Sequence, residues 1–234
     1  MSGSSKLDRA SSLRGTSGDL TLYFVRHGES VANLSDRNGS KRPDDADRLS
    51  GHGWEQARGL GRRLQGEGLE LIVASPMTRA QETAQGIADV LGLPVETDED
   101  LFEVRQSDAF YAASPDYGDT GTISWMPTAP PDFAEPGAES FDDIVARVRR
   151  VMERLGELAS ERRIVAVSHH NFLHFFLGVV FFGDAFTPEL VPGLYQAGHA
   201  NTGITIFERF ASREFDGVDL PGWVLTTWND RAHL

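Results

Sequence analysis

The chain has 234 residues, of which 40% are hydrophobic and 24% are charged, so it is long enough to bury a sizeable core. Its formal net charge of −13 disfavours nucleic acid and anionic membranes as partners. The absence of cysteine excludes disulfides, thiolate metal sites and thiol catalysis, and it fits a cytoplasmic location. No apolar run reaches the length of about 18 residues that a membrane-spanning helix needs, so we expect no membrane partner.

Residues 1–19 are rich in serine and glycine and contain no apolar segment of the kind found in signal peptides. We predict a flexible tail over residues 1–19 and a single domain over residues 20–234. From Leu20 onward, strand patterns alternate with helix patterns. This alternation predicts a three-layer α/β/α sandwich with a mostly parallel central sheet.

Short apolar runs indicate the strands, and apolar residues at helical spacing indicate the helices. The predicted strands span residues 20–25, 69–74, 95–97, 164–167, 204–207 and 223–227. The predicted helices span residues 53–65, 76–91, 141–155 and 172–182. Ser75 and Pro76 are expected to cap and begin the second of these helices. Ser140 and Asp143 are expected to form a capping box before the third.

Residues 104–138 show no sustained period and contain several prolines and aromatic residues. A loop of this length in a compact domain is usually functional or disordered. Because Tyr111, Tyr117, Trp125 and Phe133 supply apolar surface, we expect this stretch to fold back as an inserted lid.

The first predicted strand runs directly into Arg26, His27 and Gly28. Ligands of open α/β sheets bind outside the carboxyl ends of the strands, and glycine lets the backbone approach them closely. A fixed cation beside a potential nucleophile points to chemistry on an anion, most simply a phosphate. Taken alone, the segment fits equally well a strand that ends in a solvated, charged turn.

Other predicted strands place further polar residues at the same edge. Arg79 follows the second strand, and His169 and His170 follow the fourth, while Glu103 stands where the expected lid begins. In a parallel sheet these ends converge, so two arginines, the histidines at the two strand ends and a glutamate are expected to share one cleft.

This ordered set resembles the histidine phosphatase superfamily, which has the phosphoglycerate mutase-like fold. The resemblance runs from about Leu20 to the C-terminus. It includes Ser75-Pro76-x-x-Arg79-Ala80-x-x-Thr83-Ala84, Pro136-Gly137-x-Glu139-Ser140 and Asn229-Asp230-x-x-His233-Leu234.

The resemblance implies a role for each candidate residue. His27 is implied to be the nucleophile that becomes phosphorylated, and Glu103 the proton donor to the leaving group. Arg26, Arg79 and His169 are implied to complete the phosphate pocket, and Ser30 and Asn33 match positions that often line it.

The residue types suit phosphoryl transfer, in which charge spreads over the equatorial oxygens and fixed cations stabilise it. A neutral histidine can attack phosphorus, and a carboxylic acid can protonate the departing alkoxide. The arginines and His169 take the place of a metal, so we expect no metal and no cofactor. The four-residue spacing of His170 and His174 could hold a metal, but no further ligand stands nearby in sequence.

Two departures from the family pattern bear on function. His170 stands where many members have glycine, so we expect it at the cleft entrance, contributing to substrate binding. Residues 34–49 lack the aromatic, glycine-rich stretch of glycolytic mutases, which favours hydrolysis. We therefore expect a metal-independent phosphomonoester hydrolase that acts through a phosphohistidine on a small phosphorylated substrate.

Two alternatives stay open, namely phosphoglycerate mutase-type phosphoryl transfer and a non-catalytic binding protein on the same fold. A homodimer is one candidate oligomeric state.

The remaining histidines and arginines have simpler interpretations. His52 is expected in a turn, and His199 and His233 are expected to be structural. Five arginines are expected to lie on solvated helix faces: Arg62, Arg63, Arg147, Arg149 and Arg150.

Overall fold

The computed structural model describes residues 20–40, 42–107, 123–209, 214–215, 218–219 and 222–234. The predicted tail over residues 1–19 lies outside this part of the chain. A six-stranded sheet forms the centre, in the order β3-β2-β4-β1-β5-β8. Its strands are β1 (Leu20–Arg26), β2 (Leu71–Ala74), β3 (Val95–Thr97), β4 (Ile164–Ser168), β5 (Ile204–Arg209) and β8 (Trp223–Asp230). The strands β6 (Glu214–Phe215) and β7 (Val218–Asp219) pair separately.

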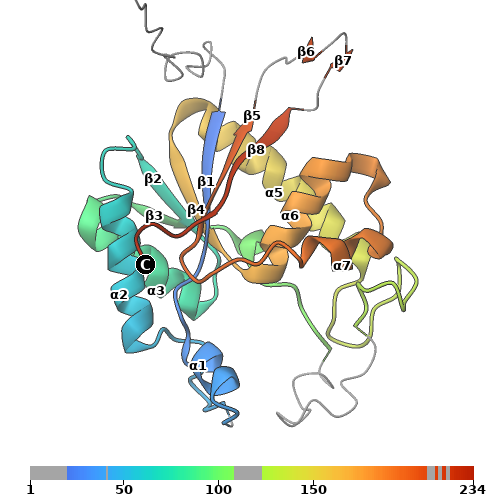
Figure 1. Ribbon diagram of the computed structural model, residues 1–234, viewed down its shortest axis with the longest axis horizontal. Helices are drawn as coiled ribbons and strands as arrows, with labels where there is room; N and C mark the ends of the chain where they lie inside the picture. The colour runs from blue at the N-terminus through green and yellow to red at the C-terminus, as the bar shows by residue number, and fades with distance from the viewer. Residues whose placement is uncertain (1–19, 41, 108–122, 210–213, 216–217, 220–221) are drawn as a thin grey trace, which may run out of the picture.

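The four strands from β3 to β1 are parallel, β5 runs antiparallel to β1, and β8 runs antiparallel to β5. The helices are α1 (Val31–Arg37), α2 (Gly51–Arg63), α3 (Thr78–Leu91), α5 (Phe141–Glu161), α6 (His170–Phe182) and α7 (Val191–Leu194). Short 3-10 turns are η1 (Glu99–Leu101), η2 (Gly183–Ala185) and η3 (Pro188–Leu190). Helices α2 and α3 cover one face of the sheet, and α5 and α6 cover the other (Figure 1). The predicted three-layer α/β/α fold is confirmed.

The alternation of side chains along β1 explains the two cores. Leu22 and Phe24 pack into the cluster formed with α5 and α6, whereas Tyr23 and Val25 pack into the cluster formed with α2 and α3. All four side chains are buried. A strand covered on both faces therefore reads as a continuous apolar run.

Several local features differ from the sequence-based expectations, and His52, expected in a turn, lies in the first turn of α2. Helix α1 was not predicted, and it begins with a reciprocal capping box between Ser30 and Asn33. Helix α3 begins at Thr78 rather than at Pro76, and its N-cap, Met77, contributes no side-chain hydrogen bond. Ser75 is not the N-cap of this helix; its hydroxyl accepts from the Met77 N–H at 3.3 Å and lies 2.7 Å from Nε2 of His169.

Within the described residues, no helix has the length and apolar character required to cross a bilayer.

Candidate active site

The ends of β1 and β4 bring the two predicted catalytic histidines together. Arg26 pairs with Ser168 in the parallel register, and the backbone N–H of His27 donates to the carbonyl of Ser168 at 2.9 Å. The next residue on each strand is a histidine, and the ring centroids of His27 and His169 lie 5.2 Å apart. The carboxyl ends of the parallel strands β1 and β4 therefore meet, as predicted.

A cavity of about 560 Å³ opens at this edge, a size typical of small-molecule sites. Seven of the eight predicted site residues line it: Arg26, His27, Ser30, Asn33, Arg79, Glu103 and His170. The eighth, His169, is fully buried beside His27 and contributes no lining surface.

The hydrogen bonds of His27 specify one tautomer. Its Nδ1 lies 2.7 Å from the carbonyl oxygen of Gly28, which can only accept, so Nδ1 carries the proton. Nε of Arg79 donates to Nε2 of His27 at 3.0 Å, so Nε2 holds a lone pair. Burial, followed by the nearby charges of Arg79 and Arg26, lowers the pKa of His27 well below 6.5. His27 is therefore a neutral imidazole whose Nε2 is available as a nucleophile.

His169 is also held neutral, because burial and the charge of Arg79 lower its pKa well below 6.5. Its Nε2 lies 2.7 Å from the Ser75 hydroxyl. Its Nδ1 is buried and has no hydrogen-bond partner among the described residues. A proton on Nδ1 would make this atom a donor next to His27.

The turn after α7 fixes the backbone and the guanidinium of Arg26. Nη1 of Arg26 donates to the carbonyl of His199 at 2.7 Å, and the Thr202 N–H donates to the carbonyl of Arg26 at 3.0 Å. The side-chain amide of Asn201 donates to the carbonyl of His27 at 2.9 Å. His199 and its neighbours thus support the end of β1, in line with the structural role expected for His199.

Arg79 has an acidic partner, Asp47, that was not predicted from the sequence. Its Nη1 forms an ion pair with Asp47, whose other carboxylate oxygen accepts from the Thr78 N–H at 2.8 Å. Nη1 lies on the opposite edge of the guanidinium from Nε, which contacts His27. Asp47 therefore anchors the far edge of Arg79 and leaves the edge facing His27 for a ligand.

Glu103 lies against the beginning of α6. Its carboxyl oxygens accept from the backbone N–H groups of Val104, Asn171 and Phe172 at 2.8, 3.2 and 3.1 Å. A carboxylate is favourable at a helix N-terminus, where the N–H groups have no partner within the helix. These three bonds hold the carboxyl group of Glu103 in place at the wall of the cavity.

The interpretation of Arg147 as a solvated residue is wrong. Its side chain is 2% exposed and makes a two-pronged ion pair with Glu139, at 2.8 and 2.7 Å. Its Nη1 donates to the carbonyls of Asp100 and Phe102 at 2.8 and 2.9 Å. Arg147 thus holds the segment that carries Glu103, which has no regular secondary structure between residues 103 and 107.

The backbone after His27 is pressed against the beginning of α2. A Cβ on Gly28 would lie 2.7 Å from the carbonyl oxygen of Gly53, and a Cβ on Gly53 would lie 2.1 Å from that of Glu29. Both contacts are closer than real Cβ atoms make. Glycine is therefore required at both positions.

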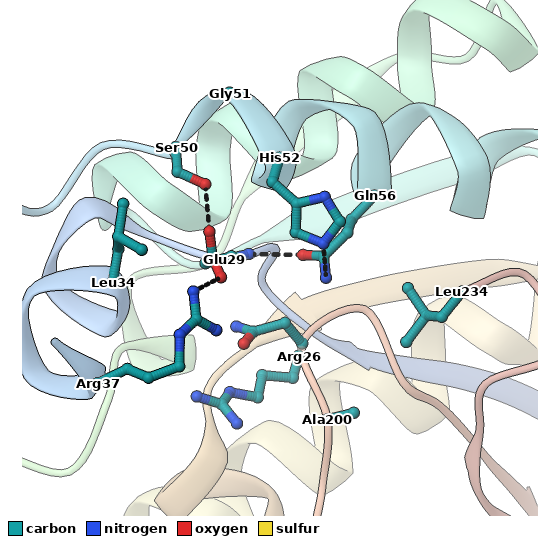
Figure 2. A pocket seen from close by; sticks show the side chains of 11 residues that line it. Arg26, Glu29, Leu34, Arg37, Ser50, Gly51, His52, Gln56, Ala200 and Leu234 are labelled. Atoms are coloured by element: carbon teal, nitrogen blue, oxygen red, sulfur yellow. Dashed lines mark hydrogen bonds and ion pairs between the residues drawn. The ribbon is translucent and has the colours of Figure 1, made fainter.

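Arg26 also lines a second cavity of about 640 Å³ (Figure 2). There the buried carboxylate of Glu29 accepts from Ser50 at 2.7 Å and from Arg37 at 2.6 Å. The Glu29 N–H donates to the side chain of Gln56 at 2.8 Å. These bonds connect the turn that follows His27 to α2, as the dashed lines in Figure 2 show.

Ser30 and Asn33 have structural partners as well as cavity surface. Each caps α1 through the other, and Oδ1 of Asn33 also accepts from Asn201 at 3.2 Å. The serine–x–x–asparagine spacing was the sequence signal for this unpredicted helix.

The paired histidines of α6 do not form a free metal-binding pair. The rings of His170 and His174 lie 4.4 Å apart, but both nitrogens of His174 are within hydrogen-bond distance of backbone carbonyls. Burial and the neighbouring His174 lower the pKa of His170 to about 3. Among the described residues, no group of three or more histidine, aspartate or glutamate side chains is placed to hold a metal.

The described residues of the expected lid fall into two groups: Val104, Arg105 and Gln106 line the cavity, whereas residues 123–138 pack away from it. Trp125 is buried and contacts Phe175 and Tyr195, and none of residues 123–138 lines the cavity. Tyr111 and Tyr117 lie outside the described residues, so the lid stays a prediction. His233, expected to be structural, has its Nε2 3.1 Å from the Thr202 hydroxyl.

Comparison with known proteins gives the family. The model of the histidine phosphatase superfamily (branch 1) matches residues 22–215. The chain belongs to the histidine phosphatase superfamily. Its resemblance to that superfamily in the sequence is thereby confirmed.

Curated relatives of this histidine phosphatase include both mutases and phosphatases. It is 34% identical to a 2,3-bisphosphoglycerate-dependent phosphoglycerate mutase of Methylobacterium sp. (strain 4-46) over 74% of this chain and 85% of that protein. It is 27% identical to the adenosylcobalamin/alpha-ribazole phosphatase of Escherichia coli (strain K12) over 66% and 75% of the two chains. The chain is thus an enzyme of the histidine phosphatase type.

A solved structure supports the same fold. Mycobacterial glucosyl-3-phosphoglycerate phosphatase has a TM-score of 0.65 and 24% identity, over 91% of this chain and all of that one. At this identity the likeness concerns the fold.

Proposed function

We propose that this enzyme hydrolyses phosphomonoesters through a phosphohistidine on His27, without a metal. The observation that carries the proposal is the hydrogen bonding of His27. Its Nδ1 proton is held by Gly28, its Nε2 carries a lone pair that accepts from Arg79, and His27 lines the same cavity as Arg26 and Arg79. A neutral nucleophile between two permanent cations is the arrangement that attack on a phosphate requires.

In the first half of the reaction, Nε2 of His27 attacks phosphorus and the bond to the leaving oxygen breaks. The departing alkoxide takes a proton from Glu103. Arg26 and Arg79 bind the equatorial oxygens, where negative charge accumulates. His169 contributes a further hydrogen bond from Nδ1.

In the second half, Glu103 is a carboxylate and takes a proton from a water molecule. The water oxygen forms a bond to phosphorus, and the bond between phosphorus and Nε2 breaks. Inorganic phosphate leaves, and His27 and Glu103 return to their starting protonation states.

Mutase-type phosphoryl transfer is the second candidate, because the relative from Methylobacterium is a phosphoglycerate mutase. A mutase returns the phosphoryl group to the organic product, whereas a hydrolase passes it to water. A non-catalytic role is less well supported, because the catalytic residue types implied by the family are all present at one edge of the sheet.

The test measures phosphate release from p-nitrophenyl phosphate by the wild type, by His27→Ala and by His52→Ala as a matched control. His52 is an exposed histidine that does not line the catalytic cavity. We expect turnover by the wild type and the control, none by His27→Ala, and no loss with excess chelator. An acid-labile phosphoprotein should form only when His27 is present.

Turnover by His27→Ala would contradict the nucleophile assignment. Chelator inhibition that added zinc or magnesium reverses would contradict the metal-independent mechanism. Interconversion of 2- and 3-phosphoglycerate at a rate that exceeds phosphate release would favour the mutase.

A further inference from the structure

The catalytic cavity contains a third arginine, Arg105, that the reaction above does not use. Arg105 lies two residues after Glu103, is exposed and lines the cavity. In the part of the chain that the structure describes, its guanidinium makes no hydrogen bond or ion pair. None of the described residues therefore engages its five N–H donors, which a ligand in the cavity can use.

Arg105 is held in position although its guanidinium has no acidic partner among the described residues. Its guanidinium stacks on the ring of Phe102 with a distance of 4.1 Å to the centroid. Arg147 lies 3.8 Å from the same centroid, so the two cations occupy opposite faces of the ring. The backbone of Arg105 both donates to and accepts from Glu139, at 2.9 and 3.2 Å.

Three neighbouring arginines, Arg37, Arg42 and Arg79, differ from Arg105 because each has an acidic partner. Arg42, which also lines the cavity, binds both oxygens of Asp36 at 2.7 and 2.5 Å. Arg37 binds Glu29 in the adjoining cavity. In a chain of net charge −13, an arginine without an acidic partner at an anion site creates local positive potential.

We propose that Arg105 binds a second anionic group of the substrate, a carboxylate or a second phosphate, while Arg26 and Arg79 bind the scissile phosphoryl group. This inference rests on the proposed function. The planar fork of the guanidinium matches two oxygens of either group. The stack on Phe102 fixes the plane of the fork, so Arg105 selects substrates with an anion at a set distance from the reacting phosphorus.

Two matched substrate pairs distinguish the sources of the second anion. Phosphoserine and phosphoethanolamine differ by one carboxylate, and fructose 1,6-bisphosphate and fructose 6-phosphate differ by one phosphate. The measured quantity is the ratio of kcat/KM within each pair, for the wild type, Arg105→Gln, Arg105→Lys and Arg58→Gln. Arg58 is the control, because it is exposed, stacks on Trp54 at 5.5 Å and does not line the cavity.

We expect the wild type to prefer the substrate with the extra anion in at least one pair, and the pair shows which anion is bound. Arg105→Gln should reduce that preference by about tenfold, as expected for loss of a hydrogen bond between charged groups. Arg105→Lys should restore part of it, Arg58→Gln should keep it, and added salt should weaken it.

A wild type without preference in either pair, or an Arg105→Gln variant that keeps the preference, would overturn the assignment. Failure of the proposed function would be seen separately, as an absence of turnover of p-nitrophenyl phosphate, a substrate that has no second anion.

Discussion

Arg147→Met is expected to lower the free energy of unfolding by about 3–5 kcal/mol, the range for breaking a buried ion pair. Arg147 is 2% exposed and donates two hydrogen bonds to Glu139 and one each to two backbone carbonyls. Methionine fills much of the same space but supplies no donor. The largest part of the cost is the carboxylate of Glu139, which would stay buried without a counter-ion.

The loss is measured by urea and thermal unfolding. For a chain of this size it corresponds to a midpoint lower by roughly 6–20 °C. The double variant Arg147→Met with Glu139→Met should regain most of the stability, because a buried pair can often be replaced by apolar side chains at little cost. The folded fraction of Arg147→Met should have reduced kcat, because the Glu103 segment loses its support.

Arg150→Met is the matched control on the same helix. Arg150 is 54% exposed and its contacts with Asp100 are 3.3 Å or longer, so its loss should cost less than about 1 kcal/mol. An Arg147→Met protein as stable as this control would refute the view that Arg147 and Glu139 hold the segment.

Three further outcomes are expected. Gly53→Ala should destabilise the protein by about 1–3 kcal/mol and lower activity, because its Cβ would lie 2.1 Å from the Glu29 carbonyl oxygen. Gly51→Ala is the control and should be tolerated, because its Cβ would have no atom within 4 Å. Equal unfolding midpoints for the two variants would contradict this expectation. Asp47→Asn should lower kcat/KM for p-nitrophenyl phosphate by no more than about fivefold, because Asp47 is 38% exposed and an ion pair in contact with solvent contributes little. A hundredfold loss would mean that Asp47 takes part in the chemistry. The free energy of unfolding should be highest above about pH 6.5. Below that pH it should fall by up to about 1.4 kcal/mol per pH unit for each buried neutral histidine, because the histidine takes up a proton in the unfolded chain and not in the folded chain. A urea midpoint that does not change between pH 7 and pH 5 would refute this. The histidines concerned are His27, His169, His170 and His199.

The sequence could predict the sheet and most of the site because both depend on local patterns. The inner strands are buried on both faces and read as apolar runs, and the proposed catalytic histidines follow directly where β1 and β4 end. Arg26 and His27 therefore stand at positions that the fold class itself marks as functional.

Tertiary partners could not be predicted in the same way. Asp47 reaches Arg79 from a loop 32 residues earlier, and no periodic pattern links the two. Arg147 did carry a signal, because it follows Ile144 by three residues and precedes Val151 by four on the buried face of α5. A charged residue on that face indicates a buried partner, and Glu139 is that partner.

The contact between Gly28 and Gly53 has a consequence for how the enzyme adapts to its substrate. The two backbones touch without intervening side chains, so the loop after His27 is closely packed against the beginning of α2. We therefore expect the position of His27 to be the same with substrates of different shape. Residues 102–106 form another wall of the cavity, which has no helix or strand and is anchored through Glu139 and Arg147. The reacting centre is fixed, and changes in substrate range should come from substitutions in that wall.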